Sequence, residues 1–146
     1  MLSVSRSVEY ALSALGHLAE RPGRVVAARE IADANNLPIA LLMQILKELQ
    51  RNDVVTSTRG VKGGYALHRA LETLSVYDLM RFLDHDLDTP DRPPGRNLST
   101  AGPVQALRHR LARCLREVMV SDLVTPGRRI DVPLEAVARC RCGGKN

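Results

Sequence analysis

Residues 59–67 read Arg-Gly-Val-Lys-Gly-Gly-Tyr-Ala-Leu, which places a glycine-rich loop before a short apolar segment. The residues before this loop, 54–57 (VVTS), are rich in β-branched side chains, which are typical of strands. Residues 65–67 can return as a second strand. The pattern therefore predicts a β-hairpin whose tip carries two basic side chains, Arg59 and Lys62.

Three amphipathic segments precede this hairpin. Apolar residues spaced three and four apart predict a helix over residues 4–20, which ends at an Arg-Pro-Gly sequence. A short helix is expected over 28–35, and a turn then leads to Pro38, which fits the first position of a helix over 38–51. The order of helix, short helix, turn, helix and hairpin is that of a winged helix-turn-helix. The predicted fold class is therefore mainly α with a small β-hairpin.

The remaining sequence predicts one more short helix and one long helix. The short helix is expected over 74–83, and residues 84–103 follow as an irregular segment with several prolines and glycines. The long helix is expected over 103–124, and its apolar residues alternate in steps of three and four, as in a coiled-coil seam. The seam consists of Val104, Leu107, Leu111, Cys114 and Val118. Such a narrow seam predicts packing against the same helix of a second copy, which makes this the dimerisation helix of a homodimer.

The chain is thereby divided into a winged helix-turn-helix domain (1–84), a loop (85–102), the dimerisation helix (103–124) and a C-terminal tail (125–146). With 146 residues, of which 45% are hydrophobic and 25% charged, the composition fits one compact globular unit and excludes disordered and fibrous classes. No apolar run approaches the ~18 residues that a membrane span needs. The N-terminus also lacks a secretory pattern, so we expect a cytoplasmic protein without a membrane partner.

The charge distribution favours a polyanionic partner. The net charge is +5, and residues 1–70 and 106–146 are both net basic, whereas the residues between them are net acidic. Basic segments of this kind can face nucleic acid. The sequence shows no spacing typical of a nucleophile with its base, so we expect that the protein is not an enzyme.

The hairpin sequence is similar to the RGxxGGYxL wing signature of one family of bacterial transcription factors. Further stretches extend the similarity, and they are residues 8–12 (VEYAL), 31–32 (IA), 37–49 and 74–79 (LSVYDL). Together these stretches resemble the IscR/NsrR/CymR-type regulators of the Rrf2 superfamily. The resemblance implies a homodimer that places two winged heads on a pseudo-palindromic operator in double-stranded DNA. It also implies a minor-groove contact by the wing, for which Arg59 is the candidate and a solvated turn arginine the alternative.

The resemblance further implies that the helix over 38–51 reads bases. Carried over by position, its base-facing residues are Ala40, Met43 and Gln44. The Gln44 amide can pair bidentately with adenine, whereas Ala40 and Met43 can only touch a thymine methyl group or act as spacers. Lys47 and Arg51 are expected either at phosphates or on a solvated face of the same helix.

Many members of this family sense iron, nitric oxide or redox state through an iron–sulfur cluster, which three cysteines hold in the loop before the dimerisation helix. In this sequence residues 84–103 contain no cysteine. The usual three-cysteine 2Fe–2S site is therefore absent, and no cofactor is predicted. An atypical mixed-ligand cluster is the alternative. Cys114 would be its first ligand, and Glu9, His17 and His109 are the residues able to approach it, because iron accepts carboxylate and imidazole.

Each of these candidate ligands also has a plainer interpretation. Glu9 and His17 lie on one polar line of the first helix, which is the pattern of a solvated face. Cys114 fits a small buried hydrophobic residue. Cys140 and Cys142 supply only two of the four ligands of a structural zinc site, so a thiol-bearing tail is expected.

Three functional classes remain open. The first is a sequence-specific DNA-binding transcriptional regulator, expected to be a homodimeric repressor that responds to redox state or a metal. The second is a protein-interaction module that has lost operator binding, which the apolar Ala40 and Met43 would favour. The third is a thiol-based redox or metal sensor that uses Cys114, Cys140 and Cys142.

Overall fold

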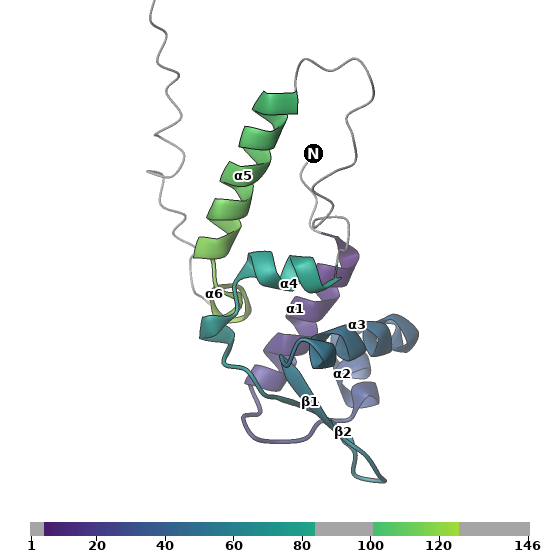
Figure 1. The fold of residues 1–146 in the computed structure, drawn as a ribbon. Helices are drawn as coiled ribbons and strands as arrows, with labels where there is room; N and C mark the ends of the chain where they lie inside the picture. Colours follow the sequence, from purple (N-terminus) through teal and green to yellow (C-terminus); the bar gives the residue numbers. More distant parts are fainter. Residues whose placement is uncertain (1–4, 84–100, 126–146) are drawn as a thin grey trace, which may run out of the picture.

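The computed structural model describes residues 5–83 and 101–125 and shows a mainly helical fold with one small antiparallel sheet (Figure 1). In chain order the elements are α1 (Arg6–Ala19), α2 (Ala28–Asn35), α3 (Ile39–Arg51), β1 (Val55–Thr58), β2 (Gly64–Leu67), the 3-10 helix η1 (Leu71–Thr73), α4 (Val76–Leu83), α5 (Ala101–Glu117) and α6 (Val120–Val124). The predicted fold class is therefore confirmed. Within the two described ranges, no helix has the length and apolar character that crossing a membrane requires.

The helices α1, α2 and α3 contact one another around an aliphatic core. α1 contributes Val8, Leu15 and Leu18, which are completely or almost completely buried. The apolar stripe that was predicted for the third helix is confirmed, and its members are Leu42, Ile45, Leu46 and Leu49. Because the core is filled from one side of α3, the other side of this helix is left for function.

The turn between α2 and α3 is tight because Asn36 adopts a left-handed backbone conformation with φ 52°. Asparagine tolerates this conformation better than most residues with a side chain. The N–H of Leu37 then donates to the carbonyl oxygen of Ala32 over 2.9 Å, which closes the end of α2. Pro38 follows directly and precedes the first turn of α3. The predicted helix-turn-helix order is thus confirmed, and Figure 1 shows the two helices beside each other.

The hairpin β1–β2 is joined at its edge by a third segment. Val26, in the short β-branched stretch after α1, forms an antiparallel bridge with Tyr65 through two hydrogen bonds of 2.8 Å. The Val26 backbone comes so near to Gly64 that a Cβ atom on residue 64 would overlap the Val26 carbonyl oxygen. A glycine at this position therefore lets the hairpin attach to the rest of the winged helix-turn-helix domain, which runs from α1 to α4 and which we call the head.

The long C-terminal helix is shorter than expected. The apolar pattern predicted one continuous helix over 103–124, and the structure corrects this, because α5 and α6 are separate helices. α5 also begins at Ala101, two residues before Pro103. The predicted loop 85–102 and tail 125–146 lie outside the described residues, apart from the ends that belong to α5 and to Thr125.

The break between α5 and α6 has a clear physical cause. Met119 is extended, with φ −88° and ψ 151°, and forms an antiparallel bridge with Ser75. The N–H of Val76 donates to the carbonyl oxygen of Val118 over 2.9 Å. The Val118 carbonyl oxygen therefore accepts its hydrogen bond from a neighbouring segment and not from the next turn of a helix. The bridge therefore ends α5 and fixes it to the segment that leads into α4.

The body of α5 projects away from the head, and its lower end contacts α4 (Figure 1). At this joint the guanidinium carbon of Arg116 lies 4.4 Å from the centre of the Tyr77 ring, which is a cation–π contact. Arg81 lies over the same ring at 5.9 Å. The head and the projecting helix are therefore joined by an aromatic contact and by a backbone bridge.

Candidate nucleic-acid interface

One face of α3 points away from the core. The residues expected to meet bases, Ala40, Met43 and Gln44, are all exposed on this face, and so is Lys47 one turn further on. Ile39 joins them, since 42% of it is exposed. Helix residues three and four apart share a face. We call this surface the α3 strip, and it consists of Ile39, Ala40, Met43, Gln44, Lys47 and Arg51.

The strip changes in character along the helix. Its N-terminal half is apolar, and its C-terminal end carries Lys47 and Arg51. The structure pairs Arg51 with Glu48, whose Oε1 accepts a hydrogen bond from Nη1 over 2.7 Å. An exposed ion pair of this kind contributes only about 0–1 kcal/mol. The Arg51 guanidinium could therefore exchange the carboxylate for another anion at little cost in free energy. No such ion pair involves Lys47 within the described residues.

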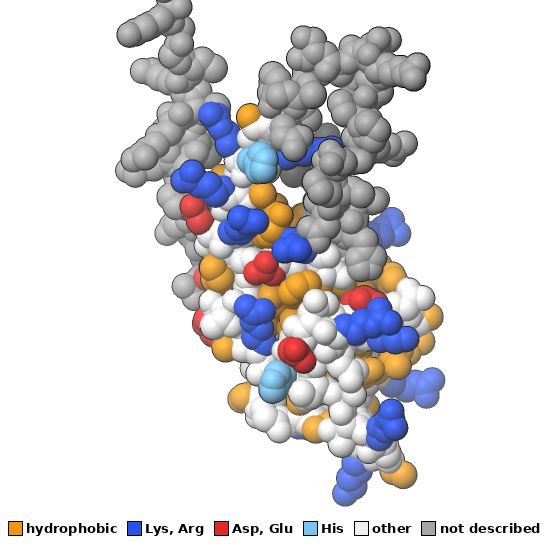
Figure 2. Space-filling model, in the orientation of Figure 1, with side chains coloured by type: hydrophobic (Ala, Val, Ile, Leu, Met, Phe, Trp, Pro, Cys, Tyr) orange, Lys and Arg blue, Asp and Glu red, His pale blue; other side chains and the backbone are white. Residues whose placement is uncertain are grey.

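The tip of the hairpin is a second exposed basic surface. Gly60 has φ 114°, a conformation that side chains disfavour, and its carbonyl oxygen accepts a hydrogen bond from the N–H of Gly63 over 2.9 Å. This tight loop leaves Arg59, Val61 and Lys62 exposed. Figure 2 shows basic side chains at the hairpin end of the molecule and again along α5. Sequence reasoning missed Ile39 and Val61, since only the fold shows that these large apolar side chains stay outside the core.

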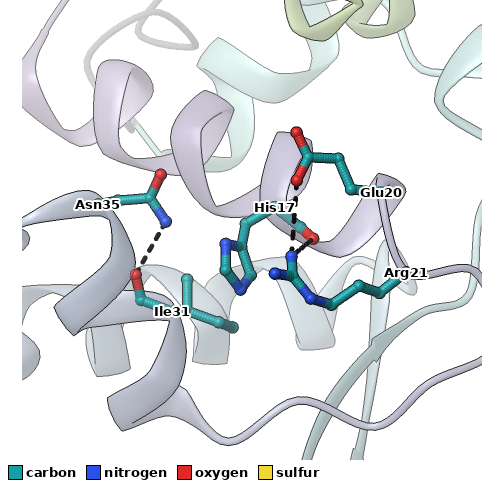
Figure 3. A network of polar contacts seen from close by, with 5 residues as sticks. All are labelled: His17, Glu20, Arg21, Ile31 and Asn35. Carbon is teal, nitrogen blue, oxygen red and sulfur yellow. Dashed lines mark hydrogen bonds and ion pairs between the residues drawn. The ribbon is translucent and has the colours of Figure 1, made fainter.

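His17 is not on the solvated face that its spacing from Glu9 predicted. Glu9 is exposed, but only 9% of the surface of His17 is exposed. Its ring lies beneath α1 near Ile31 of α2 and beside the guanidinium of Arg21, which donates to the His17 carbonyl oxygen over 3.1 Å (Figure 3). Among the described residues its Nε2 has no hydrogen-bond partner. The prediction of a solvated line is therefore wrong at His17, because α2 packs over the last turns of α1.

The candidate metal and redox residues do not form one site within a single chain. Cys114 is half-buried on α5, His109 is exposed on the same helix, and Glu9 is exposed on α1. In residues 5–83 and 101–125, no three His, Cys, Asp or Glu side chains are close enough together to hold a metal ion. Cys140 and Cys142 lie outside the described residues.

The predicted dimer seam is only partly available to a second copy. Leu107 is 57% exposed on the projecting part of α5. Leu111 and Cys114 are half-buried, whereas Val118 lies beyond the end of α5 and packs against the core of the head. The side chain of Val104 is outside the described part of the chain. The apolar surface that remains for a partner is therefore centred on Leu107 and Leu111.

A winged helix-turn-helix with a free recognition helix, a basic wing and a projecting C-terminal helix is the arrangement of a transcription factor. Residues 4–125 match the Rrf2 family model, which is described as an iron-dependent transcriptional regulator. The chain belongs to the Rrf2 family. The resemblance found in the wing signature is thereby confirmed.

Named relatives agree with this assignment. The Rrf2-family chain is 34% identical over 123 residues to an HTH-type transcriptional regulator of Mycobacterium tuberculosis, covering 84% of this chain and 76% of the relative. It is 34% identical over 76 residues to a regulator of the same description from Aquifex aeolicus, covering 52% and 53% of the two chains. The structure of CymR, the global cysteine regulator of B. subtilis, aligns with a TM-score of 0.68 at 25% identity, covering 85% of this chain and 97% of that one.

The chain is therefore a transcriptional regulator of the Rrf2 family with a DNA-binding fold. The family description also names iron dependence, and the described residues of this chain do not form a thiolate site for an iron–sulfur cluster. An iron–sulfur cluster requires several thiolates. The residues that the structure describes contain one cysteine, Cys114. The loop over 84–103 supplies no further cysteine.

Proposed function

We propose that this Rrf2-family protein is a homodimeric, sequence-specific repressor that binds a pseudo-palindromic operator. The observation that carries the proposal is the α3 strip, which is exposed along the whole recognition helix and ends in Lys47 and Arg51. An α-helix, which is about 10–12 Å across with its side chains, fits the major groove, whose width is about 12 Å. A DNA-binding regulator needs both an exposed recognition helix and a basic surface beside it. A protein-interaction module would need only the exposed helix and not the basic wing.

The residues divide into base contacts and phosphate contacts. Gln44 would pair with an adenine edge, because its amide offers one donor and one acceptor in the required geometry. Lys47 would meet the phosphate backbone, which positions the helix without reading sequence. Arg59 would enter the minor groove from the hairpin tip, where a narrow groove concentrates negative potential. Lys62 on the same loop would contact the phosphates beside this groove.

The dimer would set the distance between two heads. With α5 packed against its symmetry mate, each head faces one half-site, and half-sites about one helical turn apart match the two-fold axis. The Arg116–Tyr77 contact and the Ser75–Met119 bridge connect each head to its α5 helix. A signal that changes this joint would change the match to the operator by shifting the population between two arrangements.

The test is a DNA-binding titration of the full chain over a range of salt concentrations. A dimer that touches about eight phosphates should lose affinity with a log–log slope of about −7. Arg59→Ala should weaken specific binding by about 1–3 kcal/mol. Arg108→Ala removes the same charge from exposed α5 and serves as the matched control. If no genomic fragment binds more tightly than random DNA, the protein-interaction module is the better explanation.

We infer that the regulator has no three-cysteine cluster of the usual kind, because residues 84–103 contain no cysteine. Cys114 is then the first candidate for a redox signal, since it lies on the helix that would join the subunits. Anaerobic purification followed by absorbance and iron analysis tests both statements. A brown protein whose colour is lost in Cys114→Ala would overturn the inference and identify an atypical ligand. A colourless protein with unchanged DNA affinity in Cys114→Ser would leave Cys114 a structural residue.

A further inference from the structure

The apolar half of the α3 strip is not part of the core that residues 5–83 and 101–125 form. Ile39 and Met43 are 42% and 43% exposed, whereas the core side of the same helix is almost completely buried. The two residues are four apart, so their side chains lie next to each other on the helix surface. Ala40 completes the apolar surface beside them. When a partner covers large apolar side chains that were exposed to water, the free energy of the complex is lowered.

The surroundings of this surface favour DNA as the partner. The first turn of α3 contains no acidic residue, so nothing there repels a phosphate backbone. Along the same face the surface continues into Gln44 and then into Lys47. In helix-turn-helix proteins the N-terminal residues of the recognition helix are those that contact base edges. The apolar residues of the strip are therefore placed where bases are read, and the basic ones where phosphates are met.

In the major groove, the apolar group that a base pair presents is the C5 methyl of thymine. Building on the function proposed above, we propose that Ile39 and Met43 read thymine methyl groups, so that each half-site contains A·T base pairs beneath the first two turns of α3. Gln44 reads adenine on the same surface. Methionine suits this contact because its unbranched side chain adapts to the position of a methyl group. Operator specificity then comes from methyl contacts and one amide, with no charged reader of guanine among these residues.

The experiment replaces thymine with deoxyuridine, which removes only the C5 methyl group. A preferred duplex is first selected from a random pool with the full chain. Each thymine in the half-site is then replaced singly, and the Kd is measured at constant salt. Burial of one methyl group corresponds to about a fourfold change in affinity. We expect a loss of about this size at one or two thymines in each half-site and no change elsewhere.

Protein variants assign the effect to residues. In Met43→Ala or Ile39→Ala the affinity for the thymine duplex should fall, and the ratio between thymine and deoxyuridine duplexes should approach one. Lys47→Ala is the matched control on the same helix, because the loss of a phosphate contact weakens both duplexes equally and leaves their ratio unchanged. All three side chains are exposed, so the variants should fold, which a thermal melt checks.

Each outcome distinguishes this inference from the proposed function. If a duplex is selected and bound tightly but every deoxyuridine substitution leaves Kd unchanged, the methyl reading is wrong and DNA binding stands. If Ile39→Ala and Met43→Ala leave the thymine preference intact, other residues read the methyl groups and the assignment is wrong. If no duplex is preferred over random DNA, both proposals fail, and the apolar surface is better explained as a contact for another protein.

Discussion

Gly64 shows how much a single missing side chain contributes to the wing. Its backbone lies against the Val26 carbonyl oxygen, and the adjacent Tyr65 makes both hydrogen bonds to Val26. Gly64→Ala forces these segments apart and should lower the free energy of unfolding by about 1–3 kcal/mol, as overpacking does. Denaturant unfolding measures this. Ser57→Ala, at an exposed position of β1, is the control and should stay within about 0.5 kcal/mol of wild type. An equal, small effect of both variants would contradict the close approach.

His17 supports a prediction of the opposite sign. Its buried Nε2 has no partner among the described residues, and an unsatisfied buried polar atom is costly. His17→Leu replaces the imidazole with an apolar side chain, so stability should stay constant or rise by up to about 1 kcal/mol. Leu15→Ala, fully buried on the same helix, should instead lose about 2–5 kcal/mol. A marked loss of stability in His17→Leu, measured by thermal melting, would show that the imidazole has a partner.

Single residues were the least predictable part of the molecule from sequence. The wing glycines could be identified because a turn requires them, and the structure gives each a geometric reason. The burial of His17 could not, because the spacing along α1 does not show which side α2 will cover. The exposure of Ile39 has the same origin, since a large apolar residue in a helix is normally assigned to the core.

Among the secondary-structure elements, α4 is capped at its N-terminus by a serine side chain. The hydroxyl of Ser75 accepts a hydrogen bond from the N–H of Asp78 over 3.1 Å and donates one to its carboxylate over 2.8 Å. Ser75→Ala should therefore cost about 1 kcal/mol of stability. Ser13→Ala is the matched control, because this hydroxyl donates to a carbonyl oxygen within α1 and alanine favours helices, so no loss is expected. Equal effects in a thermal melt would argue against the cap.

Helices and strands were predictable wherever a local pattern determines them. The spacing of apolar residues predicted α1, α2 and α3, and the β-branched and glycine-rich pattern predicted the hairpin. The end of α5 was not predictable, because the bridge that stops it is made by Ser75, which lies far away in the sequence. The heptad-like spacing of apolar residues continues to Val118, although the helical backbone of α5 ends at Glu117. Tertiary pairing therefore overrode local periodicity at this one point.

At the scale of the whole molecule, the described contacts of α5 with the head gather at one joint. The described contacts at this joint are the packing of α4 on α5, the cation–π contact at Tyr77 and the bridge to Met119. All of them lie at the C-terminal end of the helix, while Leu107 is exposed nearer its other end. The arrangement separates a part of α5 available for assembly from a part that holds the head.

This separation predicts where assembly can be broken without unfolding the head. Leu111→Asp places a charge in the apolar surface around Leu107, and an unpaired charge buried between two copies should weaken the dimer by several kcal/mol, about 3–5 by analogy with broken buried pairs. Ala106→Asp adds the same charge at an exposed position outside the seam and should leave the dimer intact. Sedimentation over micromolar concentrations distinguishes the two. Helical content should remain at the wild-type level in both variants, because the core of the head lies elsewhere. A wild-type chain that sediments as a monomer would overturn the proposed assembly.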